Sequence, residues 1–259
     1  MSRTPRAEIA TNRLASRCLR RTGSLFTPGR RLWTATRARD LAARLTRAAQ
    51  RADDPQRTDR SPFVVRWRRT LARAEPDTVR LAAEILYVHL LFPTNVSAAR
   101  KRALLAATCE RLDAPPALPP ALDAALEAGI APVGLAYTRR RLSQLAWLAA
   151  AAATWWELAP PVRREALADP WRFADALDGV DVAGGGPQRA ALCHLVHPAT
   201  FTPITSATVK RAILRAYPEH VPEGERDADR ALAAVRAALE PVHGQGFSFF
   251  APEIARTWQ

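Results

Sequence analysis

One stretch in the middle of this chain limits its possible folds more than any other. The twelve residues 145–156 read LAWLAAAAATWW, an almost unbroken apolar run. A helix needs about 20 such residues to cross a bilayer, so this run is too short to span a membrane. Alanine and leucine favour helices, and the run lacks the alternation of a half-buried strand. We therefore predict a buried helix here, within a longer helix over residues 138–157.

Apolar residues recur at helical spacing along most of the chain, and prolines, glycines and aspartates separate these segments. No alternating strand pattern and no internal repeat is present. We therefore predict an all-α fold: a multi-helical globular bundle with short Pro-rich connectors. The other predicted helices cover residues 34–51, a segment beginning at 63, and residues 78–92, 98–112, 120–128, 162–167, 171–179, 188–195, 206–217 and 227–239.

The predicted domain organisation is simple. Residues 1–22 are rich in arginine and are predicted to form a disordered basic tail. Residues 23–259 are predicted to form one helical domain, with a possible sub-boundary at the Pro-rich connector near 113–120. The aromatic end of the chain, including Trp258, is predicted to pack on the body.

Positive charge is concentrated near the N-terminus. The net charge is +13, and 36 of the 38 basic residues are arginine. Residues 1–60 hold 15 arginines and 5 acidic residues, whereas the rest of the chain holds 23 basic and 20 acidic residues. A cationic segment attracts polyanions without specifying which one. Nucleic acid is therefore one interpretation, and an ordinary basic tail in an arginine-biased composition is the other.

The sequence predicts a cytoplasmic protein that is not an enzyme, with no membrane contact, cofactor or bound metal. Three widely spaced cysteines favour a reducing compartment. The glycines at 184–186 lack the Lys-Ser/Thr pair of a phosphate loop, which predicts a mobile loop. Cys193, His194 and His197 could bind zinc, but no second Cys/His pair completes a site. No nucleophile elbow or other catalytic motif is present.

Two further features concern packing. Glu84 lies inside an apolar helix, where a lone carboxylate is costly, so we predict an ion pair with Arg80 or Arg100. Trp155 and Trp156 are adjacent, which places one inward and the other nearer the surface.

Two basic groups are candidates for nucleic-acid binding. Arg139, Arg140 and Arg141 stand at the start of the long predicted helix, where they oppose the helix dipole. We interpret that unfavourable placement as a sign of contact with a phosphate backbone or an acidic partner. Lys210, Arg211 and Arg215 form the second group, and the last two share a helix face at i,i+4 spacing. The alternative for the first group is a run of solvated charges. The alternative for the second group is the solvent-facing side of an amphipathic helix.

Several segments together resemble one family. They are LWTATRARDLAARL (32–45), VRLAAEILYVHLLFP (79–93), the helix with Lys101 and Arg102, ALEAGIAPVGLAYTRRRLSQLAWLAAAAATWWEL (125–158), DPWRF (169–173) and LCHLVHPATFTPITSATVKRAILRAY (192–217). They are similar to the helical region that precedes the AAA+ motor in McrB-like ATPases of bacterial restriction and antiviral defence systems. The most specific part is the pattern of His197, Pro198, Phe201, Ile204, Ser206, Lys210 and Ile213. Where the family has a glutamate, this chain has Thr202.

The resemblance implies a recognition role and no chemistry in this chain. The sequence contains no Walker lysine and no nuclease motif, so the motor is expected to be a missing domain. In this family the front region is expected to recognise DNA or another target. We therefore expect a non-catalytic recognition or adaptor module with an AAA+ ATPase partner, binding nucleic acid through its basic faces. The alternative is a protein-interaction scaffold. The shared residues His197, Pro198, Phe201, Ser206 and Lys210 are expected to be structural.

Overall fold

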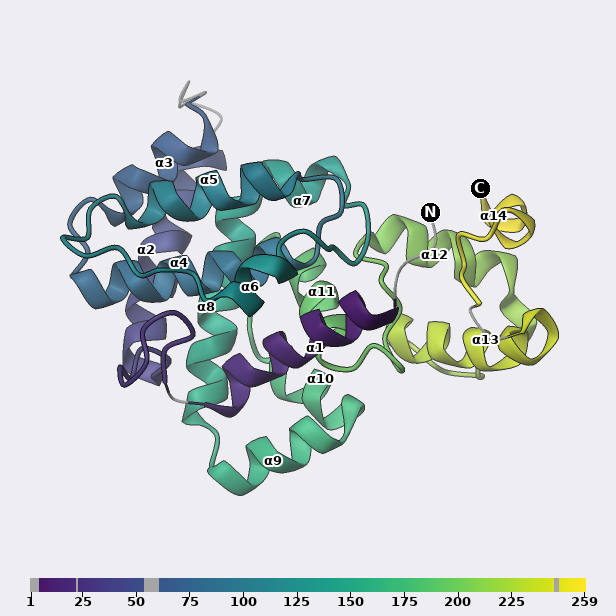
Figure 1. Ribbon diagram of the computed structural model, residues 1–259. Helices are drawn as coiled ribbons and strands as arrows, with labels where there is room; N and C mark the ends of the chain where they lie inside the picture. Colours follow the sequence, from purple (N-terminus) through teal and green to yellow (C-terminus); the bar gives the residue numbers. More distant parts are fainter. Residues whose placement is uncertain (1–4, 22, 54–60, 245–246) are drawn as a thin grey trace.

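The computed structural model describes residues 5–21, 23–53, 61–244 and 247–259, and the fold within them is all-α, as predicted. Fourteen α-helices and one short 3-10 helix are present in these residues, with no strand. The helices of the larger part, shown in Figure 1, are α1 (Pro5–Arg20), α2 (Ala35–Asp53), α3 (Phe63–Leu71), α4 (Pro76–Leu91), α5 (Ala98–Cys109), α6 (Pro120–Ala125), α7 (Leu135–Arg139), α8 (Arg141–Glu157), α9 (Pro160–Ala168), α10 (Pro170–Asp178) and α11 (Gly186–Val196).

Helices α2, α4 and α8 form the centre of this part. The apolar run predicted from the sequence lies in α8, where nearly every residue is buried. Helices α2 and α8 lie side by side, and both bury small side chains such as Ala42 and Ala149 in the core. An ion pair between Arg39 and Glu157 joins the start of α2 to the end of α8, so the pair is antiparallel.

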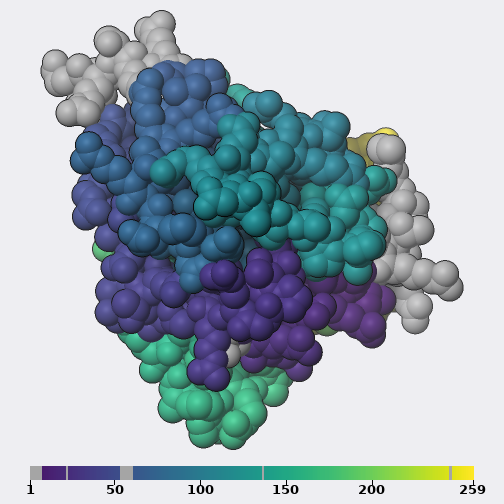
Figure 2. All heavy atoms as spheres, turned by 60° about the vertical axis from the view of Figure 1, so that its left-hand side comes forward, coloured from purple at the N-terminus to yellow at the C-terminus, as the bar shows by residue number. Residues whose placement is uncertain are grey.

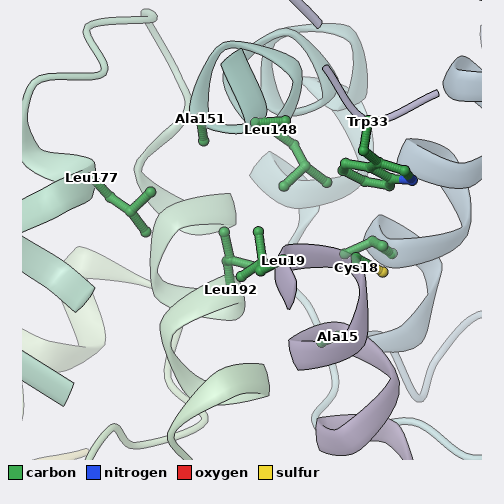
Figure 3. Close-up of a pocket in the computed structure, with 10 residues that line it drawn as sticks. Ala15, Cys18, Leu19, Trp33, Leu148, Ala151, Leu177 and Leu192 are labelled. Carbon is green, nitrogen blue, oxygen red and sulfur yellow. The ribbon is translucent and has the colours of Figure 1, made fainter. Parts of the chain in front are cut away.

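The predicted disordered tail is wrong for residues 5–20, because these residues form α1 and pack on the body. Ala15, Cys18 and Leu19 are buried against α8 and α11. They line a small apolar cavity of about 10 Å³, shown in Figure 3. The indole Nε1 of Trp155 donates a hydrogen bond of 2.8 Å to the Leu19 carbonyl oxygen. Apolar burial and a satisfied helix end therefore hold α1 in place.

Glu84 of the central helix α4 holds the segment between α1 and α2 through hydrogen bonds. The predicted ion pair between Glu84 and an arginine is therefore wrong. Its Oε1 accepts hydrogen bonds from the Ser24 hydroxyl and from the backbone N–H groups of Leu25, at 2.8 Å, and Phe26, at 3.1 Å. Its Oε2 accepts from Trp33 Nε1 at 2.5 Å. Burial raises the pKa of Glu84, and these hydrogen bonds oppose that rise.

The C-terminal unit has a hydrophobic core of its own. It comprises α12 (Ala207–Ala216), η1 (Pro218–His220), α13 (Ala228–His243) and α14 (Pro252–Trp258), and it lies to one side of the larger part in Figure 1. Residues 113–120 join two parts of the larger core, so the two cores divide near residues 197–206 instead. Polar contacts link the units: Arg230 approaches Asp175 at 3.3 Å and lies over the Trp171 ring at 4.5 Å.

Candidate nucleic-acid interface

The predicted helix over 138–157 is interrupted at Arg140, and this break separates the three consecutive arginines. Arg140 leaves helical geometry, with φ −94° and ψ 33°, so α7 ends at Arg139 and α8 begins at Arg141. The side chains of Arg139 and Arg140 are exposed. Arg141 is only 9% exposed, so it is not a surface contact of the kind predicted for all three.

Arg141 is a largely buried arginine that forms no ion pair within the described residues. Its guanidinium lies 4.7 Å from the centre of the Phe63 ring, and its Nε atom is buried without a hydrogen-bond acceptor. No carboxylate in the described part of the chain forms an ion pair with it. Burial lowers the pKa of Arg141, and the charge of Arg100 lowers it further. The site therefore holds a charge that the described residues leave uncompensated.

Arg100, Arg139, Arg140 and Arg141 make up what we call the arginine cluster. Arg100 is exposed at the start of α5. None of the four is ion-paired within the described ranges. By contrast, the neighbouring Arg102 binds Asp123, with its Nε 2.7 Å from the carboxylate. The cluster is therefore a local excess of positive charge, which attracts anions.

A buried polar group joins α4, α7 and α11. Gln188 Oε1 is 2.7 Å from His89 Nδ1 and accepts a 3.0 Å hydrogen bond from the Tyr137 hydroxyl. Burial lowers the pKa of His89 to about 3, and the charge of Arg141 adds to this shift. His89 is therefore neutral at physiological pH, so it adds no charge to the cluster. The Gln188 Nε2 group is buried and has no acceptor.

The second predicted basic group, Lys210, Arg211 and Arg215, also contains both buried and exposed side chains. Lys210 is buried and ion-paired with Asp229 of α13, so it is not available to nucleic acid. Arg211 and Arg215 are exposed on α12, as the helical spacing predicts. Of the six predicted basic contacts, four are therefore at the surface.

The residues of the family pattern make packing contacts at the junction of the two cores. His197 ends α11, and its ring lies 5.3 Å from that of Phe173. Phe201 is buried against Trp171, with ring centres 5.1 Å apart. Ser206 caps α12 by accepting a hydrogen bond from the Val209 N–H at 3.3 Å. Pro198 directly follows the end of α11.

The structure reveals a basic surface that sequence reasoning assigned to a disordered tail. Arg13, Arg17 and Arg20 lie on the exposed side of α1, and no ion pair to them is present within the described residues. Figure 2 shows the N-terminal residues as a band across one face of the molecule. The spacing of Ala15, Cys18 and Leu19 was the signal that could have identified this helix.

The glycine loop contacts α8 through Gly185. A Cβ atom on Gly185 would lie 2.3 Å from Cδ1 of Trp147, and Gly184 has φ +79°. Glycine is needed here because the indole covers the backbone. Within the loop expected to be mobile, Gly185 is therefore packed, whereas Gly186 is exposed.

The thiols and imidazoles make structural contacts. Cys193 is buried, and burial raises its pKa to about 12, which suppresses nucleophilicity. The Nδ1 atom of His194 lies 2.6 Å from the Phe201 carbonyl oxygen, and its Nε2 atom lies 3.0 Å from Oε1 of Glu8.

No group of three His, Cys, Asp or Glu side chains within the described ranges is placed to hold a metal ion. No helix in those ranges is long and apolar enough to cross a membrane.

Taken together, the fold and the site describe an all-α structure in which Arg100, Arg139 and Arg140 are exposed and form no ion pair within the described residues. Comparison of the chain with protein-family models, with curated proteins and with solved structures finds no match.

Proposed function

We propose that this protein is a non-catalytic recognition module that binds nucleic acid through the arginine cluster, in the manner expected of the front end of a McrB-like restriction ATPase. One observation carries the proposal: Arg139, Arg140 and Arg141 stand at the break between α7 and α8 and Arg100 stands at the start of α5, and none of the four has a carboxylate partner among the described residues. The neighbouring Arg102, by contrast, pairs with Asp123.

The chemistry of the cluster suits a phosphate backbone. Arginine offers a planar fork of donors that matches phosphate oxygens, and it keeps its charge at any physiological pH. The exposed Arg139 and Arg140 supply the outer contacts. Arg13, Arg17 and Arg20 of α1, and Arg211 and Arg215 of α12, provide further positive surfaces for a long polyanion.

The test is fluorescence anisotropy with labelled single-stranded and duplex DNA and with RNA. We expect the double variant R139Q/R140Q to weaken binding about tenfold or more, because two charge-assisted contacts are lost. The matched control is R68Q/R172Q, which removes two exposed arginines that pair with Glu110 and Glu165. Equal affinities of the two double variants would refute the assignment of the cluster.

A second candidate function is a protein-interaction scaffold without a nucleic-acid role. It is favoured by two apolar side chains of the C-terminal unit, Val242 and Phe250, which are 78% and 49% exposed. Contact surfaces between proteins contain exposed apolar side chains. This candidate predicts that V242S/F250S abolishes co-purification with an AAA+ ATPase partner, whereas R139Q/R140Q leaves it unchanged.

A further inference from the structure

A polar cleft of about 640 Å³ lies where the first turn of α4 meets the start of α2 and the segment after α5. We call it the Asp77 cleft. Its lining includes Arg30, which precedes α2, Arg37 of α2, and Asp77 and Arg80 of α4. None of the arginine cluster lines it. Pockets of this size hold whole small molecules, so the Asp77 cleft has room for more than a single ion.

Three guanidinium groups converge on one carboxylate in this cleft. The Nη1 atoms of Arg30 and Arg80 lie 2.9 Å and 3.1 Å from Oδ1 of Asp77. The Nη1 atom of Arg37 lies 2.6 Å from Oδ2 of the same residue. Because all three contact one carboxylate, the three guanidinium groups also lie beside one another. The side chains of Asp77 and Arg80 are 25% and 14% exposed, so the centre of this group is partly removed from water.

The group has more positive than negative charge. Burial would raise the pKa of Asp77, but hydrogen bonds from Arg37 and Arg80 and the charge of Arg30 lower it, so the carboxylate is ionised at neutral pH. No other carboxylate pairs with these three arginines within the described residues, which leaves two positive charges unbalanced. The positive end of the α4 dipole lies at the same place. Each guanidinium has several N–H donors, so donors remain for a second anion.

Acidic side chains at the rim of the cleft restrict what that anion can be. Asp40, Glu75 and Asp113 line the cleft, are exposed, and form no ion pair within the described residues. They repel a polyanion that would bring several phosphates into the cleft. Carboxylates accept hydrogen bonds from hydroxyl and amino groups. The lining therefore matches a small molecule with one anionic group and several hydrogen-bond donors.

We propose that the Asp77 cleft binds a small phosphomonoester that also carries hydroxyl or amino groups, with its phosphate held by Arg30, Arg37 and Arg80. A phosphomonoester carries close to two negative charges at neutral pH, which balances the group, whereas a carboxylate carries one. This site is separate from the arginine cluster, so it does not depend on the proposed binding of nucleic acid.

The first experiment is isothermal titration calorimetry of the whole chain at neutral pH and low salt, with ribose 5-phosphate, inorganic phosphate and ribose. Ribose 5-phosphate should bind about tenfold tighter than inorganic phosphate, and ribose should not bind. R30Q/R37Q should weaken the binding of ribose 5-phosphate about tenfold or more, because two charge-assisted contacts are lost. The matched control is R39Q, which removes an exposed arginine of α2 that pairs with Glu157 outside the cleft, and it should keep the wild-type affinity.

D77N separates a ligand site from a merely structural ion-pair group. The Asp77 carboxylate competes with the phosphate for the same arginines, so D77N should bind ribose 5-phosphate about tenfold tighter than the wild type. Its thermal midpoint without ligand should fall, because three arginines lose their shared counter-ion, and ribose 5-phosphate should restore it. A structural group would give the fall in midpoint without tighter binding.

D40N/D113N tests the rim. It should reduce the preference for ribose 5-phosphate over inorganic phosphate, because acceptors for the sugar hydroxyls are lost. No binding of ribose 5-phosphate to the wild type, equal affinities of R30Q/R37Q and R39Q, or weaker binding by D77N than by the wild type would each overturn the proposal. Equal affinities of the wild type for ribose 5-phosphate and inorganic phosphate would overturn the assignment of an organic phosphomonoester.

Discussion

Replacing Glu84 by glutamine tests how the segment before α2 is held to the central helix. The wild-type carboxylate meets hydrogen-bond donors on both oxygens, at Ser24, Leu25 and Phe26 on one side and Trp33 on the other. In E84Q the NH₂ group must replace one of these oxygens, so a donor then faces a donor in a buried place. Losing a hydrogen bond to a charged group costs about 1.5–3 kcal/mol, and an unmatched buried donor adds to this. We expect a loss of about 3 kcal/mol in the free energy of unfolding.

Urea denaturation at neutral pH measures this loss, and Trp33 supplies the control. W33F removes the indole donor and should cost about 2 kcal/mol. In the double variant E84Q/W33F, the amide NH₂ can occupy the Oε2 position without meeting a donor. The double variant should therefore lose less than the sum of the single variants, by at least about 1 kcal/mol. If the effects add within about 0.5 kcal/mol, or if E84Q is as stable as the wild type, the reasoning is wrong.

Three further predictions concern other local features. Burial lowers the pKa of Lys101 to about 8, so the folded state releases this proton before the unfolded chain does, near pH 10.4. The stability of the wild type relative to K101M should therefore rise as pH increases from about 8 to about 10.4, and a constant difference in urea denaturation would contradict this. G185A should destabilise the protein by more than about 2 kcal/mol, because the new methyl group would lie 2.3 Å from Cδ1 of Trp147; an unchanged midpoint in thermal unfolding would refute that contact. S206A should cost about 1 kcal/mol through loss of the α12 cap at the Val209 N–H, and S206D should restore most of it in the same assay.

The helical periodicity predicted the fold class because most helices are amphipathic or fully apolar and end at prolines. It also predicted the different environments of the two adjacent tryptophans. Trp155 is buried, and the half-buried Trp156 lies under Arg163, whose guanidinium is 4.2 Å from the ring. Features of this kind depend on the spacing of residues within one helix, which can be read from the sequence.

The errors come from features that depend on distant parts of the chain. Helix α1 contains many arginines, and its burial depends on residues such as Leu192 of α11, more than 170 positions away. Glu84 finds backbone N–H groups in an irregular segment, a partner that no spacing rule identifies. The separation of Arg141 from Arg139 and Arg140 depends on a single non-helical residue. The sequence therefore indicated Arg139, Arg140 and Arg141 as a basic group, and it identified neither Arg100 as a member nor Arg141 as the buried residue.

The salt dependence of nucleic-acid binding tests the central claim most directly. For a single-stranded ligand, the logarithm of the binding constant falls with the logarithm of salt concentration by about 0.7 for each phosphate contact. We predict that R139Q/R140Q lowers the magnitude of this slope by about 1.4, whereas R68Q/R172Q leaves it unchanged. A wild-type affinity that does not vary with salt, or the same slope for R139Q/R140Q as for the wild type, would contradict the account.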